Sequence, residues 1–386
     1  MKNRFLALVL ASVLAISMVA CGSNDSEKDS SETKTEKQED AKPIEYDVDE
    51  YVSLGDYKGI EVTLTGTYDY TDEGAADFVD KTIAEAGIYV EDATQTEVAE
   101  DSIVNVDYVG SQDGVAFDGG SAENQMIDVA GNCSTSGGGY IDGFTSGLAG
   151  HAVGEEVAYE VTFPEQYQSA DLAGQTVIFT FQINYVAKLV ESKDDLTDDI
   201  VKEKFGSETV DEYIEGVKEQ YKSDLETNYD KDKEAAVLDT IINNSKISQV
   251  PEELINARVD MYMNLLEMQC KQYNTTTKDY FASIGQDYDE YVSGMKGDLS
   301  ESLKEELVLE AIAKKEALEV DETEYQAFIQ RLMSSTGTTD EDEFYEVYTV
   351  PSYDGKRYFR QQFLMQQAMK LCVENANVNV SSETAE

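Results

Sequence analysis

The side chains best suited to covalent or proton-transfer chemistry are few and scattered. The only histidine, His151, stands in Gly150-His-Ala-Val-Gly154, which is typical of an exposed turn, and no serine or cysteine motif surrounds it. After Cys21, the remaining cysteines are Cys133, Cys270 and Cys372, which lie far apart without metal-ligand spacing. The sequence therefore disfavours a triad hydrolase, a disulfide framework and a zinc site, and it predicts buried or unreactive thiols and no cofactor.

A second source of chemistry is a series of aromatic and glycine-rich blocks between Val104 and Phe181. In order these are Asp107-Tyr-Val-Gly110, Gly114-Val-Ala-Phe-Asp-Gly-Gly120, Tyr140-Ile-Asp-Gly-Phe144, Val153-Gly-Glu-Glu156, Phe163-Pro-Glu165, Leu172-Ala-Gly174 and Phe179-Thr-Phe181. Alternating apolar residues within the series predict strands. The order and spacing resemble the FKBP-type peptidyl-prolyl cis-trans isomerase domain, in particular the version carried by bacterial trigger factor. The resemblance implies an antiparallel β-sheet domain with a short helix over residues 99–189.

The chemistry that this resemblance implies needs no nucleophile. Rotation about an X-Pro bond is opposed by an amide resonance barrier of about 18–20 kcal/mol. A pocket lowers that barrier if it binds the twisted amide better than either planar form. The resemblance places the pocket at Tyr108, Phe117, Asp118, Tyr140, Ile141, Phe144, Tyr167 and Phe181. Ile141 would supply a backbone N–H, Phe144 the floor and Asp118 a polar rim. For any single aromatic residue, a place in the core is an equally good interpretation.

Three departures from the family pattern bear on catalytic efficiency. Gln125 stands where the family often has an aromatic residue, and Asp142 replaces a proline. The stretch between Gly131 and Gly139 is longer than the usual link, and it contains Cys133 and three successive glycines. A flexible insertion beside the pocket would alter access to it. These departures leave open a protein that binds proline segments without turning them over.

The N-terminus has the features of a bacterial lipoprotein signal. A short basic start precedes an apolar run that is too short for a convincing membrane-spanning helix, and Met18-Val-Ala-Cys21 resembles a lipobox. We therefore expect a signal peptide over residues 1–20, lipidation of Cys21 and a polar, disordered tether over residues 21–45. The expected location is the extracytoplasmic face of the cell membrane.

The rest of the chain is predicted to be helical. Repeats at three and four residues begin near Val210, and further helices are expected over residues 251–272, 288–317, 322–333 and 354–375. Parts of this region resemble the trigger factor C-terminal chaperone domain, here expected over residues 190–377 with a tail over 378–386. Residues 46–98 resemble the strand and helix that pack with that domain in the family. The family's ribosome-docking domain has no counterpart in the sequence, so ribosome binding is not expected.

Two predicted helices carry methionine and aromatic residues that could either form the helical core or contact clients. These are Met261, Tyr262, Met263, Met268 and Tyr273 on one helix and Phe359, Phe363, Met365 and Met369 on the other. The core interpretation is the better one for each residue. The resemblance still implies that some helices form arms around unfolded chains, because methionine surfaces adapt to varied apolar partners.

The charge balance limits the possible partners. The net charge of −50 leaves too few cations to neutralise the phosphates of a nucleic acid, or to hold an anionic lipid surface by charge alone. The acidity either keeps the protein soluble or selects basic clients, and the sequence leaves both open.

Together these features predict an α+β, lipid-anchored, trigger factor-like isomerase. It would bind unfolded or newly exported polypeptides and their proline-containing segments. One alternative is a holdase, which uses the FKBP-like domain for binding without turnover. A transporter-associated ligand-binding lipoprotein is disfavoured, because its two lobes would need alternating strands and helices along the chain.

Overall fold

The computed structural model describes residues 44–381. The predicted signal peptide, Cys21 and nearly all of the predicted tether lie outside these residues. Among the described helices, none combines the length and the apolar character needed to cross a membrane.

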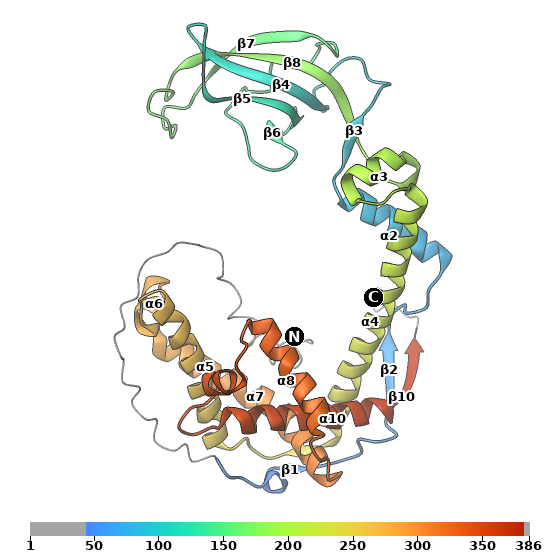
Figure 1. Cartoon of the computed structure of the whole chain (residues 1–386), viewed down its shortest axis with the longest axis vertical. Helices are drawn as coiled ribbons and strands as arrows, with labels where there is room; N and C mark the ends of the chain where they lie inside the picture. The colour runs from blue at the N-terminus through green and yellow to red at the C-terminus, as the bar shows by residue number, and fades with distance from the viewer. Residues whose placement is uncertain (1–43, 382–386) are drawn as a thin grey trace. The chain divides into compact units, whose positions relative to one another are not determined.

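The described chain forms two compact units, and Figure 1 shows their elements. The sheet unit comprises Asp69–Leu225, and the helical unit comprises the described residues up to Tyr68 and from Glu226 onward. The second boundary falls within helix α4 (Val210–Asn244). These boundaries differ from those expected at residues 98/99 and 189/190. The reason is that residues 69–98 and 190–225 pack with each other and pair with the sheet.

The sheet unit is built on a six-stranded antiparallel sheet with the order β3-β8-β4-β5-β6, in which β7 also pairs with β8. Its strands are β3 (Tyr89–Glu91), β4 (Ile103–Gln112), β5 (Val115–Asp128), β6 (Cys133–Ser134), β7 (Glu156–Thr162) and β8 (Thr176–Leu189). On β8 every second residue from Val177 to Ile183 is buried, which gives the sheet one apolar face. The predicted antiparallel sheet is therefore confirmed.

Three helices complete the sheet unit. Helix α2 (Asp72–Glu85) starts at a side-chain cap, where the Thr71 side chain accepts a hydrogen bond from the Gly74 N–H. Its buried stripe runs through Ala75, Val79 and Ile83, and Phe78 is half-buried against the same small core. After the short 3₁₀ turn η2 (Lys193–Asp195), α3 (Asp198–Phe205) and the first part of α4 pack with α2 in a separate small core.

The helical unit contains the rest of α4 and six further helices within the described residues. These are α5 (Glu252–Gln272), α6 (Thr277–Ser283), α7 (Tyr288–Lys315), α8 (Glu322–Thr336), α9 (Glu341–Val347) and α10 (Gly355–Glu374). The four long predicted helices are thus confirmed to within a few residues. The region is largely helical, but it also contains short strands.

Those strands join the N-terminal segment to the helices. After η1 (Val48–Glu50), β1 (Val52–Ser53) pairs with β9 (Lys246–Ile247), and β2 (Glu61–Thr65) pairs in parallel with β10 (Asn377–Ser381). The first four residues of the predicted 378–386 tail are therefore part of a strand. Val62 and Leu64, two residues apart on β2, are both buried, so this strand has one buried face, and Val62 packs with the helices.

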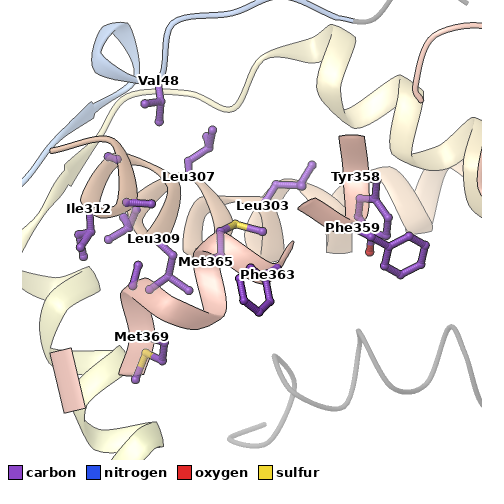
Figure 2. Packing of buried hydrophobic residues seen from close by; sticks show 14 of the residues in the cluster. Val48, Leu303, Leu307, Leu309, Ile312, Tyr358, Phe359, Phe363, Met365 and Met369 are labelled. Carbon is purple, nitrogen blue, oxygen red and sulfur yellow. The ribbon is translucent and has the colours of Figure 1, made fainter. Parts of the chain in front are cut away.

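The core of the helical unit lies mainly between α7 and α10 (Figure 2). Leu303, Leu307 and Ile312 on α7 are fully buried. Phe359, Phe363, Met365 and Met369 on α10 are each at most 4% exposed, which establishes the core interpretation for that helix. Helix α5 divides instead: Met261 is fully buried, whereas Met268 and Tyr273 are 39% and 58% exposed.

Candidate active site

Five aromatic rings of the sheet unit converge on one apolar cluster, which we call the ring cluster: Tyr108, Tyr140, Phe144, Phe179 and Phe181. Phe144 lies at its centre, stacked on Tyr140 at 4.3 Å between ring centroids and in edge contact with Phe179 at 4.8 Å. Tyr108 makes an edge contact with Phe144 at 5.1 Å. Phe144 and Phe181 are buried, while Tyr108 and Tyr140 are half-buried. Such a cluster offers a substrate a partly open aromatic surface over a closed floor.

Strand geometry explains which rings gather. Phe179 and Phe181 are two residues apart on β8, so their side chains point to the same face of the sheet. Tyr108 on β4 pairs with Phe181 in the antiparallel register, which brings its ring to that face. Phe179 was not among the predicted site residues, although this period of two could have identified it.

The backbone N–H of Ile141 is the polar group best placed for recognition. Ile141 is half-buried against the ring cluster, and within residues 44–381 its N–H donates to no other group. An amide N–H left without an internal partner costs free energy unless water or a ligand accepts its hydrogen. It can therefore bond a peptide carbonyl placed over the rings.

Tyr159 on β7 pairs with Phe179 on β8, so its ring lies on the same face of the sheet and supports the floor of the cluster. Its hydroxyl donates to the Phe144 carbonyl at 2.5 Å, and its ring stacks on Phe181 at 5.3 Å. A side chain at Gly147 could not coexist with this ring, because its Cβ would lie 2.4 Å from Tyr159. Burial raises the pKa of Tyr159, so the hydroxyl stays a donor at physiological pH. The sequence patterns quoted above do not identify this contact.

Phe117 lies beside the cluster and contacts Phe179 at 5.9 Å and Phe163 at 6.0 Å. Its ring occupies the space above Gly120, where an added Cβ would come within 2.4 Å of it. Tyr167 packs on Phe163 at 4.6 Å and is 38% exposed, so it stands at the edge of this aromatic group.

The predicted polar residues do not join the rings. Asp118 is exposed and has no hydrogen-bond or ion-pair partner among the described residues. Gln125 is half-buried, and its amide donates to the Glu123 carbonyl of its own strand. His151 lies in a turn with its Nδ1 3.0 Å from Glu155 Oε1, away from any nucleophile.

The two tyrosine hydroxyls of the ring cluster remain protonated over the physiological range. Burial raises the pKa of Tyr108, and burial together with the nearby Tyr108 raises the pKa of Tyr140. The site therefore presents neutral donors and rings. This suits a reaction that moves no proton.

The inserted stretch between Gly131 and Gly139 is hydrogen-bonded to the sheet. Its strand β6 pairs with the end of β5, and the Ser134 N–H donates to the Gly138 carbonyl across a tight turn. Gly137 and Gly138 take φ values of 97° and 102°, which the turn requires and which other residues rarely adopt. The insertion is thus a short hairpin beside Tyr140.

The sheet unit also has an unusual charge. No lysine or arginine occurs between Lys81 and Lys188, so the sheet around the ring cluster carries carboxylates and no lysine or arginine until Lys188, near the end of β8. Asp142, next to Ile141, is exposed and has no partner among the described residues. The resulting negative potential attracts cationic segments and weakens with salt.

A second candidate surface lies at one end of the helical unit, where α6 packs against α5 and α7. Phe281 is buried there and contacts the rings of Tyr280, Tyr288 and Tyr291. Around it are five large apolar side chains, 39–58% exposed, which we call the arm-end surface: Met268, Tyr273, Tyr280, Ile284 and Tyr291. Such exposed apolar groups mark a surface for apolar partners.

A groove of about 850 Å³ lies between α8 and α10 in the helical unit. Its lining includes Arg331, Gln366 and Lys370, and it shares no residue with the ring cluster or the arm-end surface. We assign no ligand to it.

Comparison with known proteins identifies both parts of the chain. Residues 94–184 match the family described as FKBP-type peptidyl-prolyl cis-trans isomerase. Residues 209–374 match the family described as bacterial trigger factor protein C-terminus. The chain therefore carries an FKBP-type isomerase domain ahead of a largely helical trigger factor region.

Whole proteins give the same result. The chain is 36% identical to the trigger factor of Streptococcus suis over 288 residues, 74% of this chain and 64% of that protein. It is 32% identical to the trigger factor of Streptococcus mutans over 332 residues, 85% of this chain and 73% of that protein. The chain belongs to the trigger factor family, and it spans a little under two thirds of the first relative.

One solved structure, from work on promiscuous substrate recognition by the trigger factor chaperone, covers 84% of the chain. Its TM-score is 0.38 at 14% identity, and we draw nothing from it.

Proposed function

We propose that the protein is a lipid-anchored, extracytoplasmic folding factor that isomerises X-Pro bonds and holds unfolded exported polypeptides. The observation that carries the proposal is the ring cluster together with the unpartnered Ile141 N–H. The rings supply an apolar surface on which a proline side chain can pack. The Ile141 N–H supplies a hydrogen-bond donor for a carbonyl of the same proline-containing substrate.

The proposed activity follows from combining an apolar ring surface with a single hydrogen-bond donor. An apolar floor disfavours the charge-separated resonance form of the amide, which favours rotation about the C–N bond. A hydrogen bond from Ile141 that strengthens in the twisted form lowers the barrier further. No residue has to accept a proton, so neither His151 nor a cysteine has a part in the reaction.

A refolding assay tests the isomerase. Residues 22–386 should accelerate the proline-limited refolding of a model protein, and Phe117→Ala should reduce the acceleration. Phe117 is half-buried and not central to the core, so this variant should keep its circular dichroism spectrum. A wild-type chain without acceleration, but with aggregation suppressed, would replace this proposal with the holdase.

The holdase is the second candidate function, and the arm-end surface favours it. Its exposed apolar side chains resemble a binding surface more than a core. The two functions are compatible, because the surface and the ring cluster share no residue. The absence of ribosome binding, of a cofactor and of nucleic-acid partners stays a prediction.

The membrane anchor rests on the sequence pattern around Cys21. A Cys21→Ser variant expressed in a bacterium should leave the membrane fraction and lose incorporation of labelled fatty acid. Equal partition of variant and parent into the membrane would contradict lipidation at this residue.

A further inference from the structure

Asn132, the second residue of the inserted hairpin, holds the loop of residues 140–145 that carries Tyr140, Ile141 and Phe144. Its side-chain Nδ2 donates to the Tyr140 carbonyl at 3.3 Å and to the Ile141 carbonyl at 3.0 Å. Its Oδ1 accepts from the Thr145 N–H at 3.2 Å and lies 3.1 Å from Thr145 Oγ1. Its backbone carbonyl accepts from the Tyr140 N–H at 2.9 Å. One residue thus bonds both ends of the loop.

The chemistry of these partners fixes the orientation of the amide. Carbonyls can only accept and a backbone N–H can only donate, so Nδ2 must face Tyr140 and Ile141 while Oδ1 faces Thr145. Aspartate would keep the acceptor but would lose both donors and put a negative charge beside two carbonyl oxygens. Asn132 also has φ 47°, a left-handed conformation that asparagine and glycine tolerate better than most residues.

Other contacts hold the second half of this loop: Thr145 Oγ1 donates to the Val129 carbonyl at 2.9 Å, and the Ser146 N–H and Oγ both donate to the Gly143 carbonyl. The Phe144 N–H bonds within the loop to the Ile141 carbonyl, and Tyr159 holds the Phe144 carbonyl. Asp142 has no partner, and Gly143 adopts φ 82°, so the middle of the loop is not held by its own side chains. The direction of the Ile141 N–H therefore depends on the carbonyls on both sides of Ile141 Cα, and Asn132 bonds both.

We propose that Asn132 is the positioning residue of the isomerase site: it aims the Ile141 N–H and keeps Tyr140 stacked on Phe144. The proposal rests on the proposed isomerase function. It also gives the inserted hairpin a role, because the insertion carries the group that holds the pocket loop.

The test compares Asn132→Gly with Asn124→Gly in the full chain. Both asparagines have left-handed backbones, at φ 47° and 53°, in the same unit, and the Asn124 side chain makes no hydrogen bond among the described residues. The pair therefore separates loss of the Asn132 amide from the backbone effect of glycine. With a Phe-Pro tetrapeptide, Asn132→Gly should lower kcat roughly tenfold and change KM by less than about threefold. Asn124→Gly should change neither.

A second measurement does not depend on catalysis. In amide hydrogen exchange followed by NMR, the Thr145 N–H should exchange faster in Asn132→Gly than in the parent, because its acceptor is gone. Asn132→Asp should keep Thr145 protected but should be as slow a catalyst as Asn132→Gly.

The outcomes separate the two proposals. A parent chain without isomerase activity removes the proposed function, and the Thr145 exchange still reports whether Asn132 holds the loop. Activity and Thr145 exchange that are equal in Asn132→Gly and Asn124→Gly overturn the positioning role. If Asn132→Gly lost its circular dichroism spectrum together with its kcat, Asn132 would be needed for folding. That result would also overturn the positioning role.

Discussion

The ring cluster and the arm-end surface are both rich in aromatic side chains, but they differ in how those rings are held. In the ring cluster each ring contacts at least two others, and Phe144 is only 3% exposed. Next to the arm-end surface Phe281 is buried, but the members of the surface itself are exposed, with Ile284 and Tyr273 at least half exposed. The ring cluster therefore has a fixed shape, whereas the arm-end surface is an exposed apolar surface without a defined shape.

This difference shows how one chain could combine selective and unselective binding. A fixed pocket recognises one local geometry, because its donors and rings are arranged before the substrate arrives. Exposed methionine and tyrosine side chains accept many sequences, since they can change rotamer at little cost. The following variants should affect one region and leave the other intact.

The largest effect is expected from removing the floor of the ring cluster. Phe144→Ala should lower the isomerase activity by on the order of 100-fold, because Tyr140 and Tyr108 lose the ring that fixes them. It should also destabilise the sheet unit by about 3–5 kcal/mol. Refolding kinetics and urea unfolding measure the two effects. Suppression of aggregation should persist, and its loss in parallel with activity would indicate that both functions use the pocket.

The converse variant replaces Tyr280, Ile284 and Tyr291 by serine. These side chains are exposed, so the fold should survive, while binding of an unfolded client weakens roughly 5- to 30-fold as about 1–2 kcal/mol of apolar contact is lost. Light scattering of an aggregating client measures it. Val380→Ser, which removes another exposed apolar side chain of the helical unit, is the matched control. Equal behaviour of the two variants would contradict a role for the arm-end surface.

Charge should distinguish substrates at the ring cluster more weakly. Because the sheet around the ring cluster is strongly acidic, it should process a tetrapeptide with lysine beside Phe-Pro about three- to fivefold faster at low salt than one with glutamate. The ratio should fall towards one in 0.5 M salt, since screening shortens the range of the field. If the ratio of the two rates does not change with salt, the charge of the sheet does not select the substrate. The acidity would then serve solubility.

The smallest effect concerns a partly buried carboxyl group of helix α7 in the helical unit. Burial, with Asp239 and Glu306 nearby, raises the pKa of Glu305 on α7 from 4.5 to about 6. The folded state then holds the proton more tightly than the unfolded state. The charged carboxylate thus lowers stability fully above pH 6, and the penalty disappears below about pH 4.5. Glu305→Gln should raise stability by about 1 kcal/mol at pH 8 and by nothing at pH 4.

Thermal unfolding across this pH range measures the difference. Asp298→Asn, which removes an exposed carboxylate from the same helix, is the control for the loss of one negative charge from α7. A constant difference between pH 4 and pH 8 would contradict the assignment to Glu305.

The sequence predicted long elements better than short contacts. Helices α5, α7, α8 and α10 repeat their apolar residues over many turns, and Asp321 marks the start of α8 as a side-chain cap. Helices α6 and α9 were missed because seven residues hold too little periodicity to stand out. The 378–386 tail was misjudged because Val378 and Val380 only become a strand once β2 is beside them.

The site divides in the same way. The motif order identified Tyr108, Tyr140 and Phe144, which the structure brings together. It did not identify Tyr159 or Asn132, because a hydrogen bond to a backbone carbonyl 8 to 15 residues away leaves no pattern in side-chain type. Asp118 was carried over from the family, and here it faces solvent.

The lack of lysine and arginine between Lys81 and Lys188 also determines which chemical probes can detect this domain. Trypsin cuts only after lysine and arginine, so a complete digest, even of denatured protein, leaves residues 82–188 as one long acidic peptide. Amine-reactive cross-linkers likewise find no lysine on the sheet before Lys188, near the end of β8, so they cannot report a client bound over the rest of it. Mapping a client onto this domain requires carboxylate-directed reagents or a protease that cuts at aspartate, glutamate or aromatic residues.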